Sequence, residues 1–77
     1  MDILSSFGET VRFLRRQRGF SQESFADKAG LDRSYMGGVE RGKRNLSLKN
    51  IEKVSMALQL SLSQLFADVE RNDGGEG

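Results

Sequence analysis

The stretch from Arg33 to Gly38 has the residue types that read the edges of nucleic-acid bases. Arg33 can donate two parallel hydrogen bonds to O6 and N7 of guanine, and Ser34 can contact almost any base edge. Gly37 and Gly38 either let a phosphate or thymine methyl approach the backbone, or are glycines tolerated on an exposed face at about 1 kcal/mol each. Tyr35 either donates to a phosphate or packs against the neighbouring turn. The pattern predicts base recognition.

A basic loop follows this stretch and is suited to the sugar–phosphate backbone. It contains Arg41, Lys43, Arg44 and Asn45. Such a loop can clamp the backbone or insert an arginine toward a groove. A favourable interaction with the C-terminal end of a helix dipole would account for Arg41 alone, but not for the whole cluster. We therefore expect the loop to assist recognition.

Two predicted helix starts offer further phosphate sites. Ser21 and Gln22 stand at the start of one helix, and Ser47 and Lys49 stand at the start of another. The free N–H groups at a helix N-terminus attract anions. We expect these four residues to contact the nucleic-acid backbone.

The composition limits other chemistry. The chain has 77 residues with no cysteine, histidine or proline, and its net charge is only +1. Without histidine and cysteine, no pair of residues is placed as nucleophile and base, and no metal site or cofactor is expected. Residues 1–50 carry ten Lys and Arg against six Asp and Glu, whereas residues 51–77 carry two against five. This asymmetry is either an electrostatic face for a partner or an ordinary solvated surface.

The apolar spacing and the capping residues predict a single domain of five helices. The expected helices are residues 7–18, 22–29, 33–41, 48–58 and 62–68. Gly30 ends the second helix and Asp32 caps the third, so these two helices form a tightly joined pair. Ser6 with Glu9, and Ser61 with Gln64, match the capping-box pattern. The small residue Ala26 faces the third helix, which would let these two helices cross closely.

The buried face follows the same helical spacing. The expected core includes Phe7, Val11, Leu14, Phe25, Ala26, Ala29, Met36 and Val39, with Leu48, Ile51, Val54, Ser55 and Leu58 along the fourth helix. Phe13 lies off this stripe, so it is either packed against the N-terminal residues or partly exposed. Residues 1–69 form the domain, and the acidic, glycine-rich residues 70–77 are expected to be a disordered tail. No apolar run is long enough to span a membrane, and an intracellular, cytoplasmic protein is expected.

The segment Gln22–Arg41, with Ala26, Gly30 and its apolar pattern, resembles the helix-turn-helix of the Cro/CI-like (XRE) repressor family. The resemblance extends from about Ser6 to Phe66 and implies a compact all-α, lambda repressor-like DNA-binding domain. Within that family, LDRSYMGGVERGKRNLSLKNIEKV (residues 31–54) is similar to the controller proteins of restriction–modification systems, which bind palindromic operator DNA as homodimers. Phage and plasmid repressors can carry similar stretches.

The resemblance implies roles for individual residues. The third helix would be the recognition helix, with Arg33, Ser34, Tyr35 and Gly37 facing double-stranded DNA and Arg44 and Asn45 assisting from the loop. Gln22 would bind phosphate, and Arg15 with Glu40 would form a buried ion pair between the first and third helices. Gly38 departs from the family, because some relatives place a base-reading polar side chain at that position.

The last helix offers an interface for a second copy. Leu60, Leu62, Leu65 and Phe66 crowd a domain that is too small to bury all of them, although some of them close the core instead. We expect Leu62 and Phe66 to be the core members, and a homodimer through this helix and the turn before it.

The leading hypothesis is a sequence-specific transcriptional regulator of bacterial or phage origin, associated with the nucleoid, that occupies operator DNA and blocks or recruits RNA polymerase. The alternatives are a phage or plasmid repressor and an antitoxin-like interaction module whose acidic tail masks a partner. An enzyme is not expected.

Overall fold

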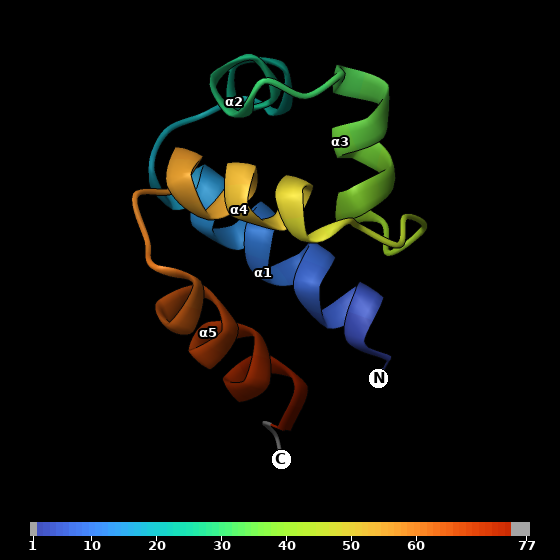
Figure 1. Cartoon of the computed structure of the whole chain (residues 1–77), viewed down its shortest axis with the longest axis vertical. Helices are drawn as coiled ribbons and strands as arrows, with labels where there is room; N and C mark the ends of the chain where they lie inside the picture. The colour runs from blue at the N-terminus through green and yellow to red at the C-terminus, as the bar shows by residue number, and fades with distance from the viewer. Residues whose placement is uncertain (1, 75–77) are drawn as a thin grey trace.

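The computed structural model describes residues 2–74 of the chain. Its helices are α1 (Ile3–Gln17), α2 (Gln22–Ala29), α3 (Arg33–Glu40), α4 (Leu48–Ala57) and α5 (Leu62–Gly74). In Figure 1, α2 and α3 lie together at one end, α4 crosses in front of α1, and α5 packs against α1 at the other end. Residues 2–74 contain no strand, so the predicted five-helix, all-α fold is confirmed. No helix among them is both long and apolar enough to cross a membrane.

Helix α1 begins four residues earlier than the sequence pattern predicts. The carboxylate of Asp2 accepts hydrogen bonds from the backbone N–H groups of Leu4 at 2.7 Å and Ser5 at 3.3 Å. Asp2 therefore is the N-cap, and the predicted capping box of Ser6 and Glu9 is wrong. Ser6 is instead fully buried inside the helix.

The core gathers apolar residues from all five helices. Its buried members are Phe7, Val11, Leu14, Phe25, Ala26, Ala29, Met36, Val39, Val54, Ala57, Leu58, Leu65 and Val69. Most of the predicted core is confirmed, and Ser55 is buried as expected. Leu48 is the exception, because its side chain is 83% exposed. Burial falls along α4 from Val54 through the half-buried Ile51 to Leu48, since the first turn of α4 reaches beyond the core.

A glycine that the sequence pattern did not single out sets the distance between α1 and α3. Gly8 is buried against the end of α3, and a Cβ atom there would lie 2.3 Å from the carbonyl oxygen of Val39 and 2.7 Å from that of Glu40. Only glycine allows this approach, because the backbone of α3 occupies the space that a side chain would need. Gly8 therefore lets α1 support the C-terminal half of α3.

Helix α5 is longer than predicted. It starts as expected, with the reciprocal hydrogen bonds of a capping box between Ser61 and Gln64. It then continues past Asp68 to Gly74, so residues 70–74, predicted as disordered tail, are helical, and residues 75–77 lie outside the described part. Val69 is fully buried, and Asp73 accepts a 2.7 Å hydrogen bond from the Ser6 hydroxyl. These contacts with α1 hold a segment whose composition alone does not indicate a helix.

Candidate nucleic-acid interface

Helices α2 and α3 are joined by the short turn that the capping residues predict. Gly30 has a φ angle of +72°, which ends α2 in the left-handed region. The backbone N–H of the next residue, Leu31, donates a 2.9 Å hydrogen bond to the carbonyl of Ala26. Asp32 then caps α3 and accepts a 2.9 Å hydrogen bond from the N–H of Ser34. The predicted pair of helices and its turn are confirmed.

The first turn of α3 presents polar side chains to solvent. Arg33 and Ser34 are both exposed. Arg33 lies 4.0 Å from the carboxylate of Glu23, with both side chains more than two-thirds exposed. An exposed ion pair of this kind contributes little to stability. The Arg33 guanidinium is therefore available to a ligand that approaches the start of α3.

Tyr35 links the basic loop to helix α4. The guanidinium carbon of Arg44 lies 5.5 Å from the centre of the Tyr35 ring, in a cation–π contact. The Tyr35 hydroxyl accepts a 3.0 Å hydrogen bond from the side-chain amide of Asn50. Tyr35 thus contacts Arg44 and Asn50, and its hydroxyl keeps a hydrogen that can be donated to a phosphate. Asn50 was missed because its partner lies 15 positions away and on another helix.

Gly37 and Gly38 are buried beneath other side chains, so the expectation that they lie bare on the outer face is wrong. A Cβ atom at Gly37 would lie 3.2 Å from an Nη atom of Arg41 and 3.3 Å from Oε1 of Gln22. At Gly38 it would lie 3.0 Å from Cγ and 3.1 Å from Nε of Arg44. The atoms over both glycines belong to flexible side chains and not to backbone. They form the surface on which three long polar side chains lie.

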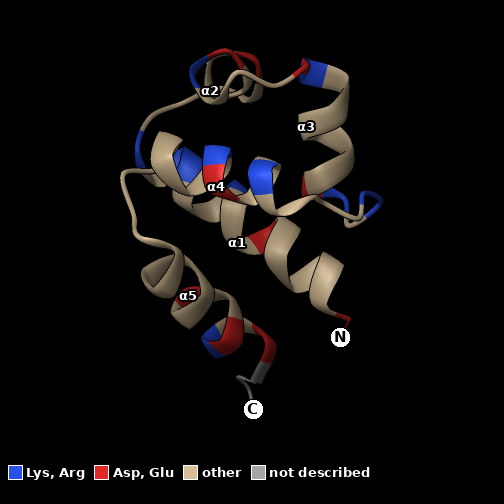
Figure 2. Ribbon diagram, in the orientation of Figure 1, with Lys and Arg blue, Asp and Glu red and all other residues tan. Residues whose placement is uncertain are grey.

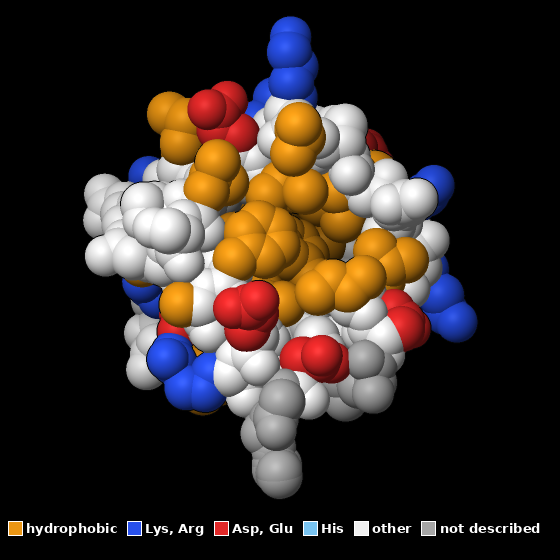
Figure 3. Space-filling view, turned by 60° about the horizontal axis from the view of Figure 1, so that its bottom comes forward, with side chains coloured by type: hydrophobic (Ala, Val, Ile, Leu, Met, Phe, Trp, Pro, Cys, Tyr) orange, Lys and Arg blue, Asp and Glu red, His pale blue; other side chains and the backbone are white. Residues whose placement is uncertain are grey.

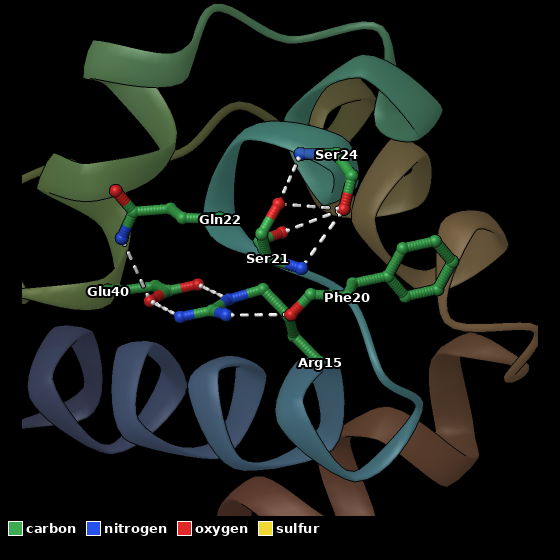
Figure 4. A network of polar contacts seen from close by, with 6 residues as sticks. All are labelled: Arg15, Phe20, Ser21, Gln22, Ser24 and Glu40. Atoms are coloured by element: carbon green, nitrogen blue, oxygen red, sulfur yellow. Dashed lines mark hydrogen bonds and ion pairs between the residues drawn. The ribbon is translucent and has the colours of Figure 1, made fainter.

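A buried ion pair holds α1 against the end of α3, as the family resemblance implies. Arg15 donates to both carboxylate oxygens of Glu40, at 2.7 and 2.9 Å, and to the carbonyl of Phe20 at 2.9 Å. The amide of Gln22 donates to the same carboxylate at 3.1 Å (Figure 4). The hydrogen bonds to Glu40 raise the pKa of Arg15 above its ordinary value, although burial acts in the opposite direction. The network fixes α1, α2 and α3 relative to one another.

The remaining predicted backbone contacts lie around this unit. Lys43, Asn45 and Lys49 are exposed, and Figure 2 shows the basic loop beyond the end of α3 and the basic residues of α4. The hydroxyl groups of Ser21 and Ser47 cap α2 and α4 by accepting hydrogen bonds from backbone N–H groups at 3.0 and 3.2 Å. These two serines therefore have a structural role in the free protein.

An apolar surface lies on the face formed by α5 and the N-terminal end of α1. A hollow of about 160 Å³ is lined by Ile3, Leu4, Phe7, Asn45, Leu46, Ile51 and Phe66. Figure 3 shows hydrophobic side chains gathered around a hollow in the view from below the molecule. Ile3, which lines the hollow, and Leu62, which lies one helical turn before Phe66 on α5, are 55% and 44% exposed. Their exposure leaves apolar area for a partner.

The structure differs from the prediction in which leucines of α5 are buried and which are exposed. Leu65 is fully buried within the chain, so it closes the core and is not an interface residue. Leu62, expected in the core, is exposed, whereas Leu60 and Phe66 are half-buried. The reason is the orientation of α5, which turns Leu65 and Val69 toward α1 and places Leu62 outside.

Phe13 is exposed, which decides between its two predicted positions. Its side chain is 62% exposed. It lines a groove of about 570 Å³ between α1 and α5, together with residues such as Gln17 and Asp68. Phe13 therefore does not pack against the N-terminal residues.

The fold and the site define a helix-turn-helix protein in which the first turn of α3 is exposed and polar. A sequence profile of the helix-turn-helix family matches residues 11–65. Control protein C.MunI from a Mycoplasma species is 48% identical over 71 residues, which cover 91% of this chain and 96% of that protein. The chain belongs to the helix-turn-helix family and, within it, to the controller proteins.

Solved structures agree with this assignment. The restriction–modification controller protein C.AhdI from Aeromonas hydrophila has 54% sequence identity and a TM-score of 0.79, over 82% of this chain and 96% of that one. A structure of C.Esp1396I bound to a 25 base pair operator site has 32% identity and a TM-score of 0.86, over 95% of this chain and 96% of that one. The predicted family resemblance is confirmed.

Proposed function

We propose that this protein is the controller of a restriction–modification system and regulates transcription by binding palindromic operator DNA as a homodimer. The observation that carries the proposal is the exposure of Arg33 and Ser34 on the first turn of α3, with Arg44 held beside the same helix. A rigid helix with exposed donors at its N-terminal end suits base recognition in the major groove. The operator-bound relative supports the same ligand for this chain.

We assign roles to the side chains according to their positions. Arg33, Ser34 and Arg44 read base edges, and Gln22, Arg41, Lys43, Asn45 and Lys49 contact the sugar–phosphate backbone. Tyr35 holds Arg44 against its ring and can still donate its hydroxyl hydrogen to a phosphate, because that hydroxyl only accepts from Asn50. Gly37 lies beneath Gln22 and Arg41 and shapes the reading surface. Ser21 and Ser47 present helix N-termini to phosphates.

The dimer forms through the apolar surface at α5 and the N-terminal end of α1. A single recognition helix reads few base pairs, so two copies related by a two-fold axis are needed for specific binding. The exposed Leu62 and Ile3 provide the contact, together with Phe66, which lines the hollow with Ile3 and lies one helical turn from Leu62, and the half-buried Leu60. RNA polymerase is a further proposed partner. The protein is proposed to act in the cytoplasm, at the nucleoid. Its proposed role requires neither enzymatic activity nor a cofactor.

Selection of bound sites from random DNA tests the proposed function. The expected result is a palindromic site whose half-sites are one helical turn, about 34–36 Å, or a multiple of it apart. The Arg33→Ala variant should relax selection at one base pair of each half-site and lose about 1–3 kcal/mol of binding free energy. Lys43→Ala should weaken binding to all DNA sequences by a similar factor. Recovery of random sequences by the wild-type protein would contradict the proposal.

Gene context separates a restriction–modification controller from a phage repressor. The phage alternative has some support, because an immunity repressor of Bacillus phage phi105 is 34% identical over 61 residues. Neighbouring methyltransferase and endonuclease genes are expected, and phage structural genes in their place would favour the repressor.

A further inference from the structure

A third concave surface lies beside the helix-turn-helix, between α1 and the end of α3. It has a volume of about 290 Å³, and its charged and amide-bearing lining residues are Arg12, Arg15, Arg16, Gln22, Glu40 and Arg41. Four of these six side chains carry guanidinium groups. Arg12 and Arg16 come from the exposed side of α1, which has no part in the two-helix unit itself.

The charges of this surface are not balanced within the part of the chain that the structure describes. Glu40 is the only carboxylate there that lines it, and hydrogen bonds from Arg15 and Gln22 already occupy that group. The ion pairs found among residues 2–74 involve Arg15, Arg33 and Arg71. Within those residues, the guanidinium groups of Arg12, Arg16 and Arg41 therefore have no carboxylate within 4.0 Å. Three positive charges remain for an anion.

The cavity is continuous with the face assigned to DNA. Gln22 and Arg41 meet above Gly37 in the middle of α3, where a Cβ atom would lie within 3.3 Å of both side chains. Both residues also line the cavity. The arginines of α1 therefore extend the DNA-facing surface past the first residues of α2.

We propose that Arg12 and Arg16, together with Arg41, bind a backbone phosphate of the operator and so make α1 part of the DNA interface. The inference rests on the proposed function, because it takes DNA as the ligand. A planar guanidinium group donates parallel hydrogen bonds that match the oxygens of a phosphate. The C-terminal dipole of α1 accounts for Arg16, which lies in the last turn, but not for Arg12.

Salt-dependent DNA binding tests this inference. The double variant Arg12→Gln with Arg16→Gln should keep the operator sequence preference but bind more weakly. The magnitude of the slope of log K against log salt concentration should decrease by up to about one, because two of the three cations at this phosphate are removed. The control is Lys28→Gln with Lys53→Gln, which removes the same charge from exposed positions outside the cavity. The control should retain the wild-type slope.

The outcomes distinguish this inference from the proposed function. A wild-type slope in the arginine variant, or an equal decrease in the lysine control, would overturn the role of Arg12 and Arg16 while leaving operator binding intact. If the wild-type protein selects no operator, the proposed function itself fails. Circular dichroism checks that each variant is folded, and Arg12→Gln alone is the substitute if the double variant unfolds.

Ethylation interference gives a second readout that does not depend on overall charge. Ethylation of the phosphate that faces α1 should weaken binding by the wild-type protein and by the lysine control. The same modification should have a smaller effect on the arginine variant, because only Arg41 remains there to bind this phosphate. An interference pattern identical in all three proteins would contradict the inference.

Discussion

Arg15 of α1 and Glu40 at the end of α3 form a buried, bidentate ion pair, with N–O distances of 2.7 and 2.9 Å. Side-chain exposure is only 7% for Arg15 and 3% for Glu40. Because Glu40 is the last residue of α3, the pair fixes the orientation of α3 relative to α1. Gly8 supports the same junction by allowing close contact of the two backbones.

Removal of one member of this pair should destabilise the protein strongly. Glu40→Ala leaves the guanidinium of Arg15 buried without its carboxylate, at a cost of about 3–5 kcal/mol in the free energy of unfolding. The double variant Arg15→Met with Glu40→Leu should recover much of that stability, since neither charge remains. Urea denaturation measures both. A cost below about 1 kcal/mol in Glu40→Ala, typical of an exposed pair, would contradict the burial of the pair.

Gly8→Ala should also be strongly destabilising. The new Cβ atom would lie 2.3 Å from the backbone oxygen of Val39, so α1 and α3 must move apart. A decrease of about 1–3 kcal/mol or more in the free energy of unfolding is expected in thermal or urea denaturation, as for other overpacked sites. The neighbouring exposed residue provides the control, because Glu9→Ala should change stability by less than about 0.5 kcal/mol. Equal stabilities of the two variants would rule out the close crossing.

Gly38→Ala should separate stability from DNA binding. The added methyl group meets the flexible side chain of Arg44 rather than backbone, and alanine favours the helix by about 1 kcal/mol over glycine. The free energy of unfolding should therefore be unchanged or slightly higher than that of the wild type. Operator affinity should fall about tenfold, because Arg44 is pushed from its place on the Tyr35 ring. Unchanged affinity in a titration with labelled operator would mean that this position of Arg44 is not used in recognition.

Two leucines of α5 should behave differently when substituted. Leu62→Asp places a charge on the exposed apolar surface, so sedimentation equilibrium should show a weakened dimer and little change in monomer stability. Leu65→Ala opens a cavity at a fully buried position and should cost about 2–5 kcal/mol in unfolding. A dimer that tolerates Leu62→Asp would exclude this surface as the interface.

The N-cap of α1 should make stability depend on pH in acid. Backbone hydrogen bonds from Leu4 and then Ser5 lower the pKa of Asp2, so its carboxylate is favoured in the folded state. The stabilisation is present above the ordinary carboxyl pKa, near 4, and disappears as the pH falls through the lowered value. The melting temperatures of wild type and Asp2→Ala should therefore differ at neutral pH and converge in acid. Asp2→Asn keeps a neutral cap, so its difference from Asp2→Ala should not vary with pH.

The helix pair could be predicted because its signals are local. Gly30 ends α2 and Asp32 caps α3 through hydrogen bonds that span two to five residues. The same is true of Ser47 and of the capping box that starts with Ser61. Ser6 shows the limit of such signals, because Asp2 offers a competing cap that starts the helix earlier.

Local signals along the chain are thus enough to predict the presence of the five helices, most of the core and the polar character of the first turn of α3, but not the start of α1 or the end of α5. The packing of the helices sets which distant side chains meet: Arg44 with Tyr35 and Gly38, Asn50 with Tyr35, and Asp73 with Ser6. It also turns Leu65 inward and Leu62 outward. The difference is one of range, since capping and helical spacing depend on neighbours along the chain, whereas these contacts depend on how separate helices pack.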